Sequence, residues 1–303
     1  MTPTIHVLTG CTAVGKTELA LRWAEANGAE IVSCDSLLFY RGMDIGTAKP
    51  TAAELVRVPH HLVDIRAVTE PMDVTHYVTL ARAAVADILG RGRQVLVTGG
   101  SGFYLKAFFA AVADEVTVAD ELRARLRARL EQAGLASLVA ELQQLNPLGL
   151  GALDTQNPRR VIRALERCLA SGRTLAELKA EFAALPAPFA AYEIRLCELV
   201  RDKEELEQRI ARRVAGMLQA GLIEEVRGLL AAGLEKNESA AKAIGYRETI
   251  DVIRGLRPEA DLPAAIEQNT RALVKKQRTW FKTQLPDHRQ IGASQATVAE
   301  LFV

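Results

Sequence analysis

The residues best suited to chemistry stand near the start of the chain. They form the eight-residue segment Gly10-Cys11-Thr12-Ala13-Val14-Gly15-Lys16-Thr17, which matches the pattern G-x-x-x-x-G-K-[ST] of a P-loop in full. Its glycines let the backbone curl so that successive N–H groups point at a phosphate. Lys16 adds a mobile positive charge, and the Thr17 hydroxyl can hold a magnesium ion. The segment predicts a diphosphate or triphosphate site without saying whether phosphate is transferred, hydrolysed or expelled.

Two further polar groups follow apolar stretches. Asp35 comes after residues 29–34, and Ser101 lies in a glycine-rich turn after residues 94–98. Ligands of an open parallel sheet bind beyond the carboxyl ends of its strands. If the strands are neighbours, the P-loop, Asp35 and Ser101 would therefore face one pocket. Asp35 is then a ligand of metal-bound water, a general base, or an aspartate that caps its loop. Ser101 either donates to a leaving phosphate or orients Asp35, and it can also cap the next helix.

Strands and helices alternate through the first third of the chain and must position these groups. This alternation predicts an α/β fold with a P-loop NTPase-like parallel sheet flanked by helices. Strands are expected at 5–8, 29–34, 61–65, 94–98 and 192–199, and helices at 73–89, 202–220, 222–232, 239–254 and 262–284.

The composition changes in the middle of the chain. β-Branched residues become rare, and Ala, Leu, Arg and Glu recur at helical spacing. This predicts an all-helical insertion domain at 119–189 within a catalytic core that comprises 1–118 and 190–303.

The overall composition is that of a globular protein, with 49% hydrophobic and 25% charged residues in 303. The apolar runs are too short to span a bilayer, and no secretory signal is expected before the first strand. Four scattered cysteines argue against a zinc site and fit a reducing compartment. We therefore expect a cytoplasmic protein with no membrane partner. The cysteines are Cys11, Cys34, Cys168 and Cys197.

The net charge of +1 gives no global field that would attract nucleic acid. Local basic faces exist, however. Residues 157–173 hold five arginines and one glutamate, and residues 270–282 hold five basic residues and no acid. Such a face is an ordinary solvated surface, a binding site for a polyanion such as RNA, or the lid of a kinase. The residues alone leave these three alternatives open.

The segment 33–50, SCDSLLFYRGMDIGTAKP, resembles a block of the tRNA dimethylallyltransferase (tRNA isopentenyltransferase) family. The similarity continues in family order over nearly the whole chain. We expect the bacterial type, because no zinc-finger segment of the kind found in some eukaryotic relatives is seen. The similar segments are the P-loop and residues 59–65, 99–106, 157–166, 243–247 and 270–281.

The resemblance implies transfer of a dimethylallyl group from dimethylallyl diphosphate to N6 of the adenosine 3′ to the anticodon of tRNA. Diphosphate is released, Mg²⁺ is the cofactor, and ATP is not consumed. By this resemblance Asp35 is the base near N6. Lys16 and Thr17, with magnesium and the P-loop N–H groups, stabilise the leaving charge, and Ser101 assists at the reaction centre.

The resemblance also implies which residues contact RNA. The helical insertion would hold the anticodon stem-loop, and the protein is expected to act as a monomer. This sequence departs from the family at Cys11, which replaces a usual Pro, and at Ser101, which replaces a common Thr. Leu38 stands where many members have Gln. The implied tRNA contacts are Asp35, Ser36, Leu37, Leu38, Ser101, Arg123, Arg159, Arg160, Val161, Ile162 and Arg163.

Three other functions use some of the same features. A small-molecule kinase would combine the P-loop with the insertion as a lid, and it would consume ATP. An adenylate isopentenyltransferase would act on free nucleotide, although the long basic insertion argues against it. A nucleotide-gated RNA-binding switch would not catalyse transfer, and the absence of an N-K-x-D signature weakens a GTPase version.

Overall fold

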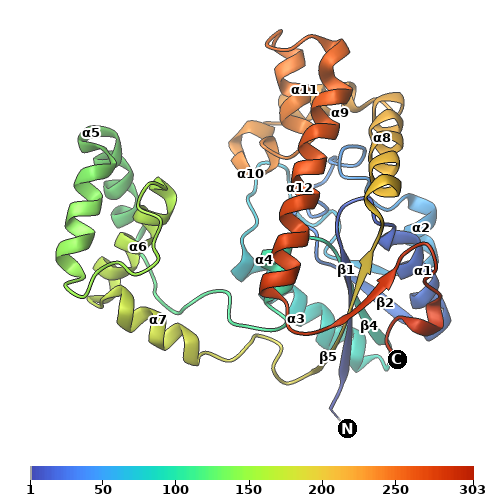
Figure 1. The fold of residues 1–303 in the computed structure, drawn as a ribbon, viewed down its shortest axis with the longest axis horizontal. Coiled ribbons are helices and arrows are strands. Elements are labelled where there is room, and N and C mark those ends of the chain that lie inside the picture. The colour runs from blue at the N-terminus through green and yellow to red at the C-terminus, as the bar shows by residue number, and fades with distance from the viewer. Residues whose placement is uncertain (1) are drawn as a thin grey trace. The chain divides into compact units, whose positions relative to one another are not determined.

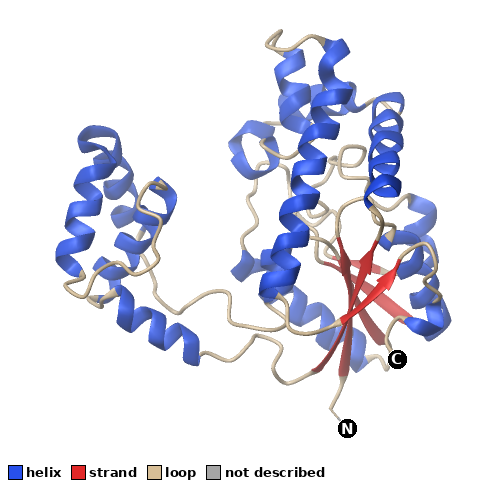
Figure 2. Ribbon diagram, viewed as in Figure 1, coloured by secondary structure: helices blue, strands red, loops and turns tan. Residues whose placement is uncertain are grey.

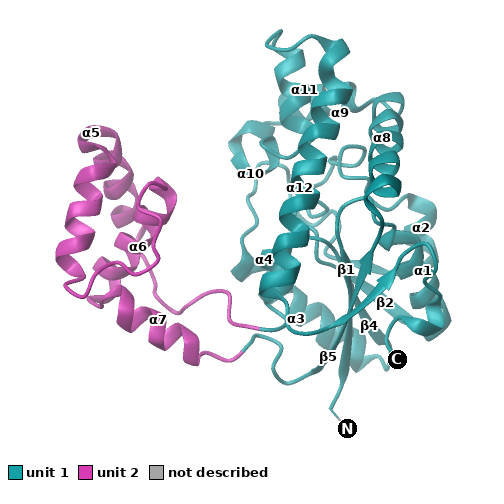
Figure 3. Cartoon of the chain, in the orientation of Figure 1, with its two compact units in different colours: residues 1–109, 187–303 teal, residues 110–186 magenta. Residues whose placement is uncertain are grey.

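The computed structural model describes residues 2–303 and divides them into two compact units (Figure 3). One unit holds the residues up to 109 together with 187–303, and the other holds 110–186. The sequence suggested 119 and 189 as the borders. The helical unit begins earlier because Val116 packs against its core. It ends earlier because the Phe189 ring lies against Phe108 of the larger unit.

A single six-stranded sheet forms the centre of the larger unit (Figure 2). All its pairings are parallel, in the order β3-β2-β4-β1-β5-β6, which confirms the predicted α/β class. Central strands of such a sheet are covered on both faces and are therefore almost continuously apolar. The strands are β1 (Thr4–Gly10), β2 (Ala29–Ser33), β3 (His60–His61), β4 (Gln94–Thr98), β5 (Glu193–Val200) and β6 (Arg289–Gly292).

Four helices accompany the first half of the sheet, and the last helices gather beyond the carboxyl ends of the strands (Figure 1). The predicted helix 239–254 is two helices, because the backbone at Gly245 has a φ of 93°. The helices are α1 (Lys16–Asn27), α2 (Ala52–Arg57), α3 (Val74–Gly90), α4 (Gly102–Lys106), α8 (Lys203–Gln219), α9 (Leu222–Ala231), α10 (Glu238–Ala241), α11 (Tyr246–Ile253) and α12 (Leu262–Gln284).

The smaller unit is all-helical and has its own apolar core. It contains α5 (Asp120–Leu145), α6 (Pro158–Ser171) and α7 (Leu175–Ala184). The chain turns within α5 at Gly134, where φ is 73°. At the start of α6 the Asn157 side chain accepts hydrogen bonds from two backbone N–H groups, with proline in the first turn. The core residues are Leu126, Leu138, Leu142, Val161, Ala164, Leu165, Cys168 and Leu178.

The chain leaves the larger unit and returns to it at a stacked pair of aromatic rings. The rings of Phe108 and Phe189 are buried, with centroids 4.3 Å apart and an interplanar angle of 17°. Offset stacking of this kind adds to the free energy gained from burial. The two connections to the helical unit are thus anchored beside each other.

Within residues 2–303, no helix has both the length and the apolar character that crossing a membrane requires.

Candidate active site

The P-loop joins β1 to α1, as the motif predicts. Its backbone turns sharply, with Ala13 at a φ of 65° and Gly15 at 110°. Lys16 Nζ donates hydrogen bonds to the carbonyl oxygens of Gly10, at 2.8 Å, and Cys11, at 3.0 Å. Burial lowers the pKa of Lys16 to about 8. The Lys16 ammonium therefore loses its proton more easily than an exposed lysine does, until an anion binds beside it and stabilises the charge.

Arginines from the end of β5 and from α8 surround the P-loop. Arg209 Nε donates to the Ala13 carbonyl oxygen at 2.7 Å, and Arg201 Nε donates to that of Val14 at 3.0 Å. With Lys16 and Thr17 they line a cavity of about 810 Å³. The arginines hold the strained turn in place and add positive charge to the cavity. Neither arginine was predicted from the sequence.

Arg213 is a third missed arginine, one helical turn beyond Arg209 on α8. Its guanidinium donates to the Thr47 carbonyl oxygen at 2.9 Å. Burial lowers the pKa of Arg213, and the carboxylate of Asp35 partly opposes this effect. The four-residue spacing of Arg209 and Arg213 places them on one helix face and was the available signal in the sequence.

Asp35 follows β2, and the strand order puts β2, β4 and β1 side by side. The P-loop, Asp35 and the turn with Ser101 therefore meet at one edge of the sheet, as expected. Asp35 Oδ1 accepts a hydrogen bond from the Leu37 N–H at 3.0 Å. Asp35 thus caps its own loop with one oxygen, and it also lines a cavity of about 290 Å³.

Ser101 stands at the N-cap position of α4, but its side chain makes no capping hydrogen bond. Instead its Oγ accepts from the Ser36 N–H at 2.9 Å and donates to the Ser36 hydroxyl oxygen at 3.2 Å. The turn lies so close to β2 that a Cβ atom on Gly99 would sit 2.1 Å from the Cys34 carbonyl oxygen. Ser101 therefore fixes the loop at Ser36, the residue that follows Asp35.

Gln277 of α12 links two of the three groups. Its Oε1 accepts from the Thr12 N–H at 2.9 Å, and its Nε2 donates to the Gly100 carbonyl oxygen at 2.9 Å. One side chain thus sets the separation of the P-loop from the turn that carries Ser101.

Two cavities of opposite character meet at this edge of the sheet. The P-loop cavity is lined by charged side chains, and the 290 Å³ cavity beside Asp35 is mainly apolar. Both are lined by Thr12, Thr47 and Arg213. The apolar side chains of the 290 Å³ cavity are Leu37, Ile210, Val214, Met217, Ala243, Ile244, Ile266 and Leu273.

The donor set fits a magnesium ion. Thr17 and Asp35 both line a small cavity of about 70 Å³ beside Lys16. Mg²⁺ is commonly held by one or two protein oxygens together with water and substrate phosphates. Within residues 2–303, no cluster of three or more His, Cys, Asp or Glu side chains could hold a metal ion. An ion here would therefore take most of its ligands from a bound diphosphate and water.

The residues implied to contact tRNA lie in both units. Ser36 and Leu37 line the apolar cavity, and Leu38 lines the small cavity beside Lys16. Ser101 lies beside Ser36. In the helical unit, exposed arginines begin α6, and a partly exposed arginine lies on α5. These are Arg159, Arg160, Arg163 and Arg123.

One of the implied RNA contacts needs correction. Val161 is fully buried in the core of the helical unit, and Ile162 packs against the same core while partly buried. Their positions follow from the amphipathic pattern of α6, which turns every third or fourth side chain inward. The Val161 side chain supports the helix and is not available to RNA. Arg167, one helical turn beyond Arg163, forms an ion pair with Asp114.

The second basic face is present on α12. Arg271, Lys275, Arg278 and Lys282 are all exposed, whereas Val274 and Phe281 are buried. The helix therefore presents a basic stripe to solvent.

The same combination of motifs is found in known proteins. Residues 38–284 match the family described as IPP transferase. The chain belongs to the IPP transferase family. A tRNA dimethylallyltransferase of Opitutus terrae is 66% identical over 292 residues, which cover 96% of this chain and 94% of that protein. The tRNA dimethylallyltransferase of Deinococcus radiodurans is 42% identical over 93% of this chain and 91% of its own length.

Solved structures of IPP transferases have the same architecture. A full-length tRNA isopentenylpyrophosphate transferase of Bacillus halodurans matches with a TM-score of 0.69 and 31% identity, over 97% of this chain and 90% of that one. A eukaryotic dimethylallyltransferase acting on tRNA matches with a TM-score of 0.84 and 24% identity, over 97% of this chain and 75% of that one. The second match shows a shared fold. Both the family and the fold predicted from sequence are confirmed.

Proposed function

We propose that the protein transfers a dimethylallyl group from dimethylallyl diphosphate to N6 of adenosine-37, 3′ to the anticodon of tRNA. The products are N6-dimethylallyladenosine and diphosphate. The observation that carries this proposal is the junction of a cationic and an apolar cavity at Thr12, Thr47 and Arg213. A donor with a charged head and a hydrocarbon tail matches that junction. The names of the close relatives point to the same reaction.

Asp35 is the proposed base. The lone pair of the adenine amine is delocalised into the ring, so the nitrogen attacks well only if its proton is removed. Because Asp35 Oδ1 is held by the Leu37 N–H, the carboxylate keeps a fixed direction and leaves Oδ2 for the amine. As the N6–carbon bond forms, the carbon–oxygen bond to diphosphate breaks, and the amine proton passes to Asp35.

The P-loop side of the site stabilises the departing diphosphate. The allylic carbon becomes cation-like as this bond breaks, so the main requirement is to balance negative charge on the leaving oxygens. The P-loop N–H groups, Lys16 and Arg213 supply hydrogen bonds and positive charge there. A bound Mg²⁺, held by the Thr17 hydroxyl, would supply further positive charge to the phosphate oxygens.

The RNA must present its base from outside the stack. Extruding a nucleotide costs a few kcal/mol, which new contacts must recover. We assign these contacts to the loop after β2 and to the exposed arginines of α6. A cytoplasmic, monomeric enzyme that acts on the anticodon stem-loop is part of this proposal.

The decisive experiment uses labelled dimethylallyl diphosphate, magnesium and an unmodified anticodon stem-loop with adenosine at position 37. We expect label in the RNA and N6-dimethylallyladenosine in its digest, with none in a stem-loop that carries guanosine at that position. ATP turnover without prenyl transfer would favour a kinase. Preferential labelling of free AMP would favour an adenylate isopentenyltransferase, and RNA binding with no chemistry would favour a switch.

A further inference from the structure

The segment 41–50 forms part of the wall of both cavities. Gly46 and Thr47 line the apolar cavity, and Thr47 and Ala48 line the P-loop cavity. The segment contains no regular helix or strand, so side chains from elsewhere must fix its shape. Its position therefore influences both halves of the site.

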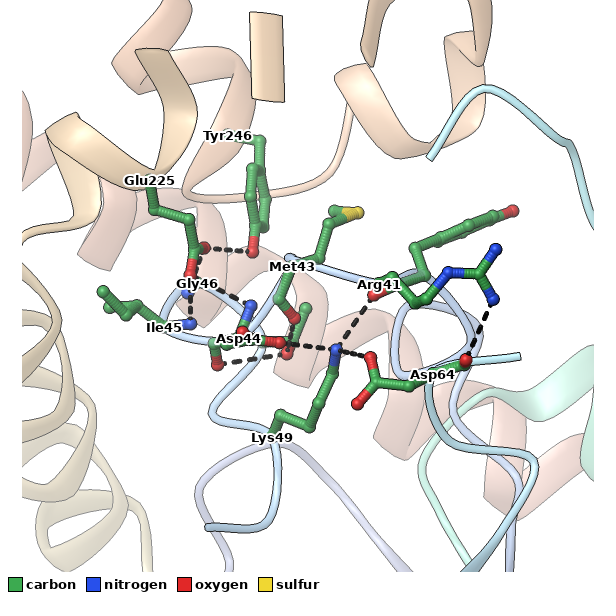
Figure 4. Close-up of polar contacts among 11 residues, drawn as sticks. Arg41, Met43, Asp44, Ile45, Gly46, Lys49, Asp64, Glu225 and Tyr246 are labelled. Atoms are coloured by element: carbon green, nitrogen blue, oxygen red, sulfur yellow. Dashed lines mark hydrogen bonds and ion pairs between the residues drawn. The ribbon is translucent and has the colours of Figure 1, made fainter. Parts of the chain in front are cut away.

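Glu225 of α9 holds this segment with both carboxylate oxygens (Figure 4). Its Oε2 accepts from the N–H groups of Asp44, at 3.0 Å, and Ile45, at 2.6 Å. Its Oε1 accepts from the Gly46 N–H at 3.1 Å and from the Tyr246 hydroxyl at 2.7 Å. Three successive backbone donors thus converge on one carboxylate, from a helix that lies 179 to 181 positions away in the sequence.

Tyr246 supports the same contact, because its hydroxyl donates to Glu225 and its ring packs on Gly46. Its ring is fully buried and lies against Gly46, where an added Cβ would come within 2.5 Å of the ring. Burial, together with the neighbouring Glu225 carboxylate, raises the pKa of Tyr246, so its hydroxyl remains a hydrogen-bond donor. Any residue larger than glycine at position 46 would displace the ring or the segment.

Lys49 closes the other end of the segment (Figure 4). Its Nζ donates to the Tyr40 carbonyl oxygen at 2.9 Å and pairs with the carboxylates of Asp44, at 2.6 Å, and Asp64. The Lys49 side chain is only 4% exposed, whereas the side chains of Asp44 and Asp64 are 59% and 41% exposed. Lys49 thus ties residue 40 to the end of the segment, while Glu225 accepts the backbone N–H groups of its middle.

The middle of the segment leads directly to the phosphate cavity. The Thr47 carbonyl oxygen accepts the hydrogen bond from Arg213 at 2.9 Å, and the Thr47 hydroxyl donates to the Met43 carbonyl oxygen at 2.7 Å. A shift of the backbone at residues 44–46 would therefore move the acceptor that orients the Arg213 guanidinium.

We propose that Glu225 is a positioning residue for the transfer reaction: it fixes residues 44–47 and thereby aims Arg213 at the diphosphate of the donor. The proposal rests on the proposed function for its substrate. Only a carboxylate satisfies this arrangement, because all four groups that face it are donors. A glutamine of the same size would turn its NH₂ group toward two of them.

The first test compares Glu225→Gln with wild type by calorimetric titration with inorganic pyrophosphate. Losing correctly placed hydrogen bonds around Arg213 should weaken pyrophosphate binding about tenfold. The KM for dimethylallyl diphosphate should rise by a similar factor, and the KM for the anticodon stem-loop should stay within about twofold. Wild-type pyrophosphate affinity and donor KM in Glu225→Gln would overturn the proposal.

Glu30→Gln is the matched control. Glu30 is also a buried carboxylate, bonded to Arg91 and His61, and it does not touch segment 41–50. We expect Glu30→Gln to lower the melting temperature and to keep the wild-type pyrophosphate affinity. If both variants weaken pyrophosphate binding equally, Glu225 has only a structural role and the proposal fails.

A double-mutant cycle identifies the route through Arg213. In an Arg213→Gln background, Glu225→Gln should weaken pyrophosphate binding by less than twofold, because its effect passes through the missing guanidinium. Full additivity would overturn the proposal.

If Glu225→Gln does not fold, a second variant tests the same contact. Tyr246→Phe removes one of the four hydrogen bonds to Glu225 and keeps the ring, and it should weaken pyrophosphate binding about threefold. Wild-type pyrophosphate affinity in Tyr246→Phe would then count against the proposal.

Pyrophosphate binding also separates this inference from the proposed function. If the wild-type protein transfers no dimethylallyl group, the proposed function fails, while the comparison of pyrophosphate affinities still decides whether Glu225 positions Arg213.

Discussion

Two groups of arginines in this protein are used in opposite ways. Arg209 and Arg213 turn inward to backbone carbonyl oxygens around the P-loop, and among residues 2–303 neither forms an ion pair. Arg160 and Arg163 of α6 point to solvent, each 3.5 Å from an acidic side chain. The inward group keeps its charge in a fixed place, which suits one small anion. The outward group offers a screened, mobile charge, which suits a polyanion such as RNA.

The largest effect should come from a residue that belongs to neither group. Asp35→Asn keeps an oxygen for the Leu37 N–H but cannot take a proton. We expect kcat to fall about a thousandfold, within the range known for loss of a general base. Pyrophosphate and stem-loop affinities should stay within about twofold of wild type. Transfer assays with titrations of both ligands check this, and near-normal turnover would exclude Asp35 as the base.

Removing an inward arginine should affect the donor alone. Arg213→Gln is expected to raise the Kd for pyrophosphate and the KM for the donor by about 30-fold, because a desolvated charged hydrogen bond is lost. Stem-loop affinity should not change. The matched control, Arg254→Gln, removes an exposed arginine paired with Glu235 and should leave both constants unchanged. An equal loss of RNA affinity in Arg213→Gln would remove the distinction between the two groups.

The pH dependence of diphosphate binding should report the protonation state of Lys16, which lies beside the inward arginines. Lys16 has a pKa of about 8 in the folded protein, below its ordinary 10.5. Between these values the unfolded chain binds more protons, so burial of this lysine costs stability below pH 8, and the cost falls as the pH rises toward 10.5. A bound anion favours the ammonium form, so above pH 8 pyrophosphate binding must take up a proton. Affinity should therefore fall by up to tenfold per pH unit.

Calorimetry from pH 7 to 9.5 measures this dependence. Lys16→Arg provides the control, because arginine does not titrate in this range and its profile reports the ionisation of pyrophosphate alone. Parallel profiles for wild type and Lys16→Arg would show that Lys16 stays charged without a ligand.

The smallest effect should come from the outward group. The double variant Arg160→Glu, Arg163→Glu is expected to weaken stem-loop binding about fivefold to tenfold at low salt and to reduce the salt slope by about one to two. Donor KM should not change. Filter binding across a salt series measures this, with Arg57→Glu as a charge-reversal control on an ion pair in the larger unit. An unchanged salt slope would favour a lid over an RNA contact.

The sequence predicted the parts of the site that are encoded locally. The P-loop lies in one continuous segment, and Asp35 and Ser101 each follow a strand whose apolar pattern is clear. The rules for parallel sheets then bring them together. By contrast, the short strand β6 was missed, because RQIG is mostly polar and exposed.

The supporting residues could not be predicted because they act across long distances in sequence. Gln277 binds Thr12 over 265 positions, and Arg209 binds Ala13 over 196. The four-residue spacing of Arg209 and Arg213 on α8 marks one helix face, but it does not say which distant backbone that face contacts. The prediction that Val161 contacts tRNA was wrong for a different reason. It treated the continuous segment 159–163 as one contact surface, although an amphipathic helix buries part of any such segment.

The stacked rings of Phe108 and Phe189 have a consequence for how the protein could be altered. The two connections to the helical unit begin and end beside these rings. The residues between them can therefore be regarded as a cassette, which can be exchanged there without a change in the strand order of the sheet. A short linker joining the two phenylalanines would yield a minimal core that retains the phosphate cradle and Asp35, and would measure what the arginine-bearing helices add to substrate choice.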